Sequence, residues 1–112
     1  MGIDLKVMAS YFRERRGELL PTATLRLERD SELFGKLAQL ARPLPQGLKA
    51  GCYEDEGLIF TDADRAGSPL TFITSADMMR LDLSGEQSRW NGAVLAFLLA
   101  LPEDARIILY WC

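Results

Sequence analysis

The chain ends with Arg106-Ile-Ile-Leu-Tyr-Trp-Cys112, in which six consecutive apolar residues follow the arginine. A strand with one solvated face alternates apolar and polar residues, whereas a strand covered on both faces has a continuous apolar run. We therefore expect this segment to be a strand at the centre of a sheet. Tyr110 and Trp111, like Trp90, are expected in the core or in a subunit contact.

Two segments near the start of the chain alternate as half-buried strands do. Residues 3–11 and 23–29 each place small or aliphatic side chains at every second position. Gly17 lies between them and suits a turn with positive φ, so a hairpin is the simplest connection. Because Pro21 cannot donate a hydrogen bond to a ladder, the second strand should begin near it or lie at a sheet edge.

A helix is predicted after the second strand. Asp30 has the chemistry of an N-cap, and the apolar residues of 33–41 follow at helical spacing. Pro43 should end this helix, because proline disfavours the helical conformation of the residue before it.

Two more helices are expected in the second half of the chain. Thr74–Asp77 resembles a capping sequence for a short helix whose Met78 and Met79 are assigned to the core. Ser84–Gln87 has the pattern of a second capping box, before a segment, 90–101, that is apolar nearly all round. A helix of that composition should be largely buried.

The remaining apolar segments, 48–53, 58–61 and 70–74, are predicted to be strands joined by polar loops. Gly57 suits the left-handed position of the first loop. Hairpins outnumber strand–helix alternation, which favours the α+β class. We expect a single domain over residues 1–112, with a mostly antiparallel sheet of about five to six strands, two to three helices packed on it, and the C-terminal strand central.

Charge is unevenly distributed along the 112 residues, whose formal net charge is -3. Residues 1–42 contain eight Lys or Arg against six Asp or Glu, and residues 43–112 contain five against ten. This acidic balance argues against nucleic acid as a partner. The longest apolar run, 93–101, is about half of what a bilayer requires, and no signal peptide is recognised. We expect a soluble cytoplasmic protein with no membrane partner.

The sequence lacks the residues that several common catalytic and metal-binding sites require. The chain has no histidine, which removes Ser-His-Asp and Cys-His sites and the commonest zinc ligand. Cys52 and Cys112 are far apart in sequence and are expected to be inert. Phosphate-binding glycine motifs are absent from the sequence. We expect no cofactor and no metal.

Acidic residues cluster in the two loops on either side of the strand at 58–61, as Glu54, Asp55, Glu56, Asp62 and Asp64. Three interpretations remain open. The acids can be solvated strand ends, a recognition patch for a basic partner, or a catalytic pair such as Glu56 with Asp62 or Asp64. A calcium loop starting at Asp62 fails, because Ala66 and Ile73 stand where the fifth and twelfth positions require oxygen ligands.

Basic residues gather in the first predicted turn, as Arg13, Arg15 and Arg16. This basic loop could hold a phosphate or an acidic peptide, although a charged hairpin tip also serves solubility alone.

The sequence favours a small non-enzymatic protein that acts by binding another protein, or itself as a homo-oligomer. One alternative is an immunity or antitoxin protein whose acidic loops mask a basic nuclease or toxin site, since opposite charge accelerates such association. A second alternative is a small enzyme that uses carboxylates.

Overall fold

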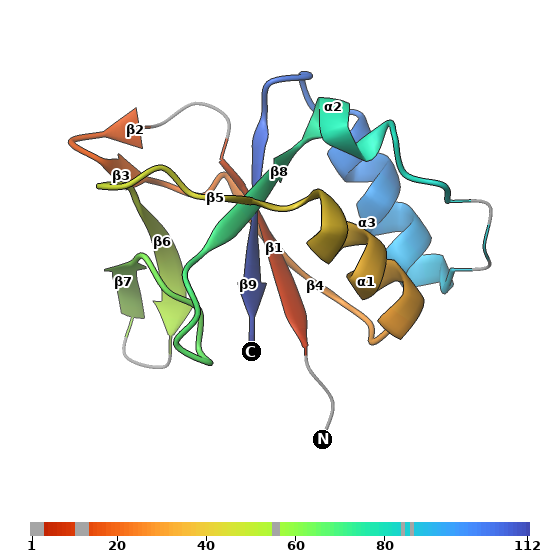
Figure 1. The fold of residues 1–112 in the computed structure, drawn as a ribbon, viewed down its shortest axis with the longest axis horizontal. Helices are drawn as coiled ribbons and strands as arrows, with labels where there is room; N and C mark the ends of the chain where they lie inside the picture. Colours follow the sequence, from red (N-terminus) through yellow and green to blue (C-terminus); the bar gives the residue numbers. More distant parts are fainter. Residues whose placement is uncertain (1–3, 11–13, 55–56, 84, 86) are drawn as a thin grey trace.

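The computed structural model of this protein describes residues 4–10, 14–54, 57–83, 85 and 87–112 (Figure 1). Of five residues in these ranges only the backbone is described, namely Ser10, Glu14, Arg15, Tyr53 and Glu54.

Five strands form an antiparallel sheet, sheet A, in the order β4-β1-β9-β8-β5. The C-terminal strand β9 is central, as its unbroken apolar run predicts. The α+β class is also confirmed. The edge strand β4 follows Pro21 by two residues, as expected for a strand that begins near a proline. The strands are β1 Leu5–Ser10, β4 Ala23–Leu27, β5 Arg42–Pro43, β8 Thr71–Thr74 and β9 Arg106–Trp111.

Four further strands form a second, smaller sheet, sheet B, in the order β2-β3-β6-β7. They are β2 Glu14–Arg15, β3 Glu18–Leu19, β6 Lys49–Glu54 and β7 Gly57–Thr61. The predicted hairpin of β6 and β7 is present, and Gly57 has the expected positive φ of 116°. Sheet B was not predicted. Strands β2 and β3 lie in the segment that connects β1 to β4, and β3 pairs in parallel with β6.

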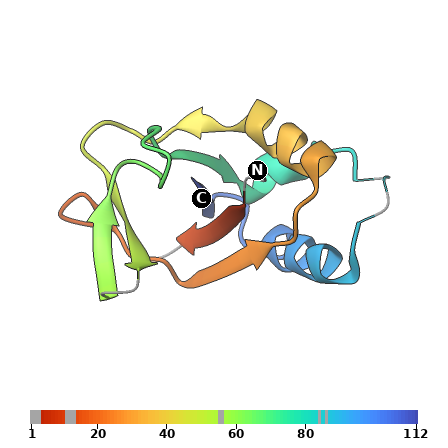
Figure 2. The same ribbon diagram turned by 90° about the horizontal axis from the view of Figure 1, so that it is seen from below.

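Sheet A lies between the helices on one face and sheet B on the other (Figures 1 and 2). Side chains alternate along β9, so Ile107 and Leu109 enter the core under the helices, while Ile108 and Tyr110 enter the core under sheet B. This double coverage explains why β9 has no polar position between its ends. Trp111 is only partly buried, with its ring edge-on to Phe34.

The helices are α1 Ser31–Leu40, α2 Ser75–Met78 and α3 Arg89–Leu99. The first two begin as predicted. The Asp30 carboxylate accepts the Leu33 N–H at 3.1 Å at the start of α1, and Thr74 and Asp77 form a capping box at the start of α2. Backbone in the extended conformation follows α1 ahead of Pro43.

Helix α3 corrects two expectations. Its N-cap is Ser88, whose Oγ accepts the Asn91 N–H at 3.1 Å, so the predicted cap at Ser84 is wrong. The helix is also not buried all round. Its buried residues recur at the spacing of one helix face, whereas Trp90 and Phe97 are exposed, because only that face meets sheet A. The buried residues are Asn91, Val94, Leu95 and Leu98.

Met78 and Met79 differ in burial. Met78 is buried in the core under the helices, as expected, but Met79 at the end of α2 is exposed. The two side chains are adjacent on a helical turn and therefore cannot share one face.

Candidate protein-interaction surface

The C-terminal end of the outer edge of β4 is covered by α3. The Trp90 indole Nε1–H donates to the Arg26 carbonyl oxygen at 2.6 Å. Asn91 binds both backbone groups of Glu28, which lies just beyond the strand. Backbone groups at a sheet edge invite pairing with another chain, and α3 occupies those of Glu28 and the Arg26 carbonyl.

The other edges are short or blocked. Strand β5 has two residues and includes Pro43, which has no N–H to donate. Strand β2, at one edge of sheet B, also has two residues. Within the residues that the structure describes, neither offers a ladder of useful length to a partner strand.

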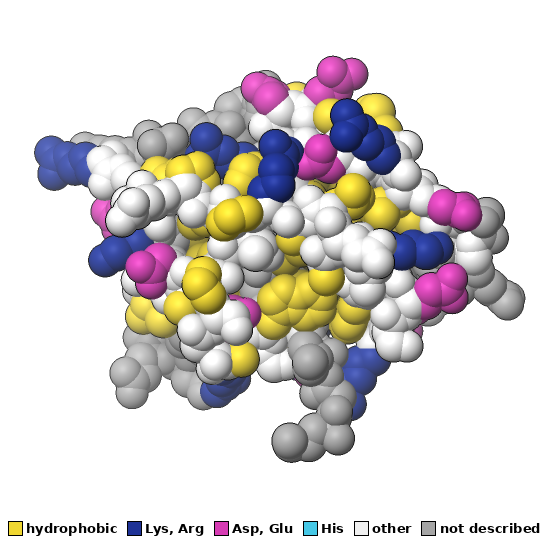
Figure 3. All heavy atoms as spheres, in the orientation of Figure 1, with side chains coloured by type: hydrophobic (Ala, Val, Ile, Leu, Met, Phe, Trp, Pro, Cys, Tyr) yellow, Lys and Arg dark blue, Asp and Glu magenta, His cyan; other side chains and the backbone are white. Residues whose placement is uncertain are grey.

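Strand β7 is different from these three edges. It has five residues, and among the described residues it pairs only with β6. Leu58 and Ile59 are 41% and 43% exposed, although both are large and apolar and point to opposite faces of the strand. In Figure 3 hydrophobic side chains reach the surface on the left, where β7 lies in Figure 1. A long edge with exposed apolar side chains is typical of a site that accepts another strand.

The direction of the β7 backbone groups follows from pairing on the far side of β6. The Lys49 N–H donates to the Gly17 carbonyl oxygen at 2.8 Å, toward β3. Successive residues of a strand turn their backbone groups to opposite neighbours, so Ala50 and Cys52 bond toward β7. Their partners in register are Thr61 and Ile59. The N–H and C=O groups of the alternate residues, Leu58 and Phe60, therefore point away from β6 to the open edge.

A small hollow lies between β3 and β7 on the outer face of sheet B. Its volume is about 220 Å³, and it is lined by Arg16, Glu18, Leu20 and Phe60. The absence of a side chain at Gly51 of β6 lets Leu58, Phe60 and Pro21 pack closely over this strand. A Cβ there would lie 3.1 Å from Leu58 and 3.2 Å from both Phe60 and Pro21. Because Glu18 and Phe60 come from the strands on either side of β6, the hollow lies on the side of β7 that is away from its open edge.

The predicted acidic residues flank β7 in the chain. Asp62 directly follows the strand and is exposed. Glu54 ends β6, and its side chain lies outside the described part of the structure, as do Asp55 and Glu56 entirely. The structure therefore describes only one of these four carboxylates, and that one lies at an end of β7.

Asp64 departs from the solvated-loop interpretation. It is buried, and its carboxylate accepts the Ser68 N–H at 3.0 Å while its own N–H donates to the Ser68 carbonyl oxygen at 2.8 Å. These bonds close the loop between β7 and β8. The carboxylate of Asp64 thus has a structural partner, and it is separated from the exposed surface that Asp62 occupies.

Of the predicted basic loop, Arg16 is described in full. It is exposed in the turn between β2 and β3, has a positive φ of 55°, and lines the hollow beside Phe60. Arg13 lies outside the described residues, and the side chain of Arg15 is not described. The structure thus brings one residue of the basic loop to β7, a proximity that the sequence did not predict.

The described residues also bear on metal binding, on the two thiols and on membrane insertion. Among them, no group of three His, Cys, Asp or Glu side chains could hold a metal ion. Cys52 is buried with its Sγ 3.7 Å from the Met8 Sδ, and Cys112 is a free, partly buried thiol. In the same part of the chain, none of the helices has the length and apolar character needed to cross a membrane.

Sequence reasoning identified the acids that flank β7 but missed the apolar residues between them. The signal was present: Leu58, Ile59 and Phe60 are consecutive apolar residues, so one of them at least must point away from a single buried face. Whether such a strand is central or exposed depends on sheet order, which the sequence does not specify.

A scan against protein-family models, a search of curated proteins and a search of solved structures each gave no match to this chain.

Proposed function

We propose that this protein binds another protein by adding an extended segment of that partner to the edge of β7. The observation that carries the proposal is the contrast among the edges. Helix α3 occupies the C-terminal end of the β4 edge, and β2 and β5 have two residues each, whereas β7 presents two outward backbone positions and exposed apolar side chains. Backbone pairing would supply affinity, and the exposed Leu58 and Ile59 side chains would contact alternate side chains of the partner strand.

Charge favours a basic partner over a second copy of this chain. Acidic residues precede β7 at Glu54–Glu56, and Asp62 follows it. Pairing of β7 with its own copy, in either direction, would bring acidic ends together, and like charges in an interface cost free energy. A partner strand with Lys or Arg at its ends would instead pair opposite charges and associate faster at low salt.

An immunity or antitoxin role is a specific form of the same proposal. Such a protein masks a basic surface, and the acids around β7 supply the complementary charge. A toxin encoded beside this protein would be the natural partner to test.

The first experiment uses a synthetic peptide of alternating valine and threonine with a pair of lysines at each end. We expect the peptide to bind, and added salt to slow its association, because opposite charges steer the encounter. A peptide with the same core and glutamates at its ends should bind at least several-fold more weakly. Equal binding of both peptides would remove the charge argument, and self-association in sedimentation at micromolar concentration would favour a homodimer.

A matched pair of variants tests the backbone contribution. Leu58→Pro removes an N–H that points to the open edge and spares the β6–β7 ladder, whereas Leu58→Ala keeps that N–H and removes the side chain. Strand addition predicts that the proline variant binds the lysine-flanked peptide more weakly than the alanine variant, with both still folded. A partner that recognises side chains alone would bind the two variants equally.

A further inference from the structure

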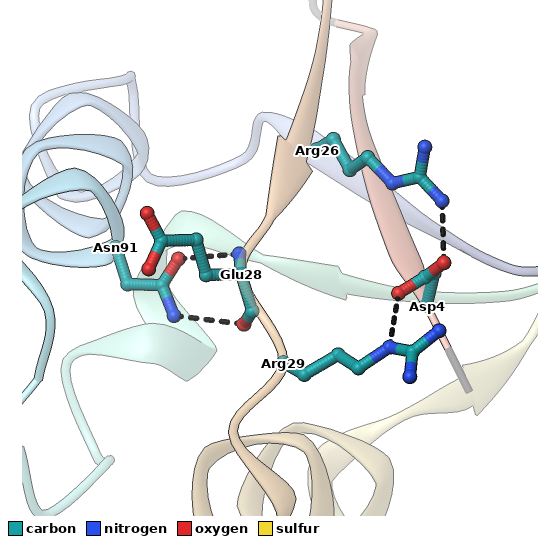
Figure 4. A network of polar contacts seen from close by, with 5 residues as sticks. All are labelled: Asp4, Arg26, Glu28, Arg29 and Asn91. Carbon is teal, nitrogen blue, oxygen red and sulfur yellow. Dashed lines mark hydrogen bonds and ion pairs between the residues drawn. The ribbon is translucent and has the colours of Figure 1, made fainter. Parts of the chain in front are cut away.

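Two arginines, in and just after the edge strand β4, bind one carboxylate that directly precedes β1. The Asp4 carboxylate accepts the Arg29 Nε–H at 2.8 Å, and its other oxygen accepts a hydrogen bond from Arg26 (Figure 4). Asp4 is mostly buried, with its side chain 20% exposed, whereas the Arg26 and Arg29 side chains are 59% and 61% exposed. The carboxylate thus fixes the two guanidinium groups side by side and leaves them accessible to solvent.

The groove is lined by two arginines and two carboxylates, and one of these carboxylates, Asp4, is held by the arginines themselves. The hydrogen bond from Arg29, together with the charge of both arginines, holds the pKa of Asp4 below its usual value, so Asp4 is ionised at neutral pH. One carboxylate then faces two guanidinium groups, and Lys6 is the neighbour of Arg26 in the register of β1 and β4. Glu28 is close by, but its side chain turns toward α3 in Figure 4.

Most guanidinium donors remain available. A guanidinium group has five N–H donors. Among the described residues, Asp4 is the only acceptor for Arg26 and Arg29. An oxyanion with several acceptor atoms could therefore bridge both groups without displacing Asp4.

Trp90 provides a flat apolar wall beside these arginines. Its Nε1–H donates to the Arg26 carbonyl oxygen at 2.6 Å, which fixes the orientation of a ring that is 47% exposed. Trp90, Arg26 and Arg29 line one shallow groove of about 630 Å³, together with Asp4, Leu27 and Glu28. An aromatic ring held in place at the surface can stack on a planar ligand at little cost in conformational entropy.

We propose that this groove binds a phosphate monoester that carries an aromatic ring. The phosphate would bridge Arg26 and Arg29, whose planar guanidinium groups suit bidentate contacts to phosphate oxygens, and the ring would lie against Trp90. Nucleoside monophosphates and aryl phosphates share this chemistry. The groove is formed by sheet A and α3, so the proposal does not depend on strand addition at β7.

The experiment titrates adenosine monophosphate, phenyl phosphate, adenosine and inorganic phosphate into the protein and follows the two tryptophan indole N–H signals by NMR. The Trp90 signal should shift with both aromatic phosphates, with a dissociation constant of roughly 0.1–1 mM because the groove is shallow. Preference for one of these two identifies the source of the phosphate ester. Adenosine and inorganic phosphate should each bind at least fivefold more weakly.

Three variants separate the contributions. Arg29→Gln should weaken both aromatic phosphates by at least fivefold. Trp90→Leu, followed through the Arg29 backbone amide signal because its own indole signal is lost, should weaken them while leaving inorganic phosphate unchanged. Arg80→Gln, at an exposed arginine after α2, is the matched control and should bind as the wild type does. The proposal is overturned if no ligand shifts the Trp90 signal at 10 mM, if adenosine binds as well as its monophosphate, or if folded Arg29→Gln binds like Arg80→Gln.

Discussion

Asn91 of α3 forms two hydrogen bonds with the backbone of Glu28. Its Oδ1 accepts the Glu28 N–H at 2.7 Å, and its Nδ2–H donates to the Glu28 carbonyl oxygen at 2.9 Å (Figure 4). The amide therefore pairs with the end of β4 as a neighbouring strand would. This contact blocks extension of the β4 edge at its C-terminal end, and the edge of β7 has no comparable contact among the described residues.

Asn91→Ala should destabilise the protein by about 1–3 kcal/mol, because it removes both partners of Glu28 from a site where Asn91 is buried. Urea unfolding measures the change. Arg89→Ala, at an exposed position in the same helical turn, is the control and should cost less than about 0.5 kcal/mol. Equal effects of the two substitutions would mean that the Asn91 bonds contribute nothing.

Two glycine-to-alanine substitutions should change the stability of the fold in opposite directions. Gly51→Ala should destabilise by about 1–2 kcal/mol, because its Cβ would crowd the rigid ring of Pro21 at 3.2 Å. Gly35→Ala lies on the exposed side of α1 with no atom near the added Cβ, and it should stabilise by roughly 0.5–1 kcal/mol. Thermal melts of both variants test this, and a stabilised Gly51→Ala would contradict the packing described for sheet B.

The Asp77 cap predicts a dependence of stability on pH. Partial burial raises the pKa of Asp77, but the Thr74 N–H and Arg42 outweigh it, so the pKa lies below the ordinary 3.8. A carboxyl with a lowered folded pKa stabilises the fold above its unfolded pKa and loses this contribution as the pH falls through the folded value.

Asp77→Asn should therefore lower the free energy of unfolding by about 0.5–1.5 kcal/mol at pH 7. The difference from the wild type should shrink as the pH falls below 3.8. Urea unfolding at a series of pH values measures it. A difference that stays constant down to the acid transition would assign the effect to packing instead of charge.

The acids at Asp62 and Asp64 should respond differently to substitution. Asp64→Ala should cost about 1 kcal/mol or more, because the Ser68 N–H loses its acceptor. Asp62→Ala, at an exposed position, should change stability by less than about 0.5 kcal/mol. Similar losses from both would show that burial does not separate their roles.

Local structure was largely predictable from the sequence. The caps at Asp30 and Thr74, the turn glycine Gly57 and the central position of Arg106–Trp111 each follow from nearby residues. The start of α3 was not, because the capping pattern of Ser84–Gln87 favours an earlier start, whereas the N-cap is Ser88 and Ser84 lies outside the described residues.

Relations between distant segments were not predictable. Nothing local distinguishes a strand that joins sheet A from one that joins sheet B, so the exposure of β7 could not be derived. The same holds for the groove, where Asp4, Arg26 and Trp90 come from three segments that are far apart in the sequence. The acids around β7 were identified by composition, but the burial of Asp64 depends on how its loop closes.

Amide hydrogen exchange of β7 tests the central claim most directly. In the free protein the Leu58 and Phe60 amides point to the open edge and should exchange quickly, whereas Ile59 and Thr61, bonded to β6, should exchange slowly. Adding the lysine-flanked peptide should slow exchange at Leu58 and Phe60 and leave the other two unchanged. Binding that leaves Leu58 and Phe60 as fast as in the free protein would contradict strand addition at β7.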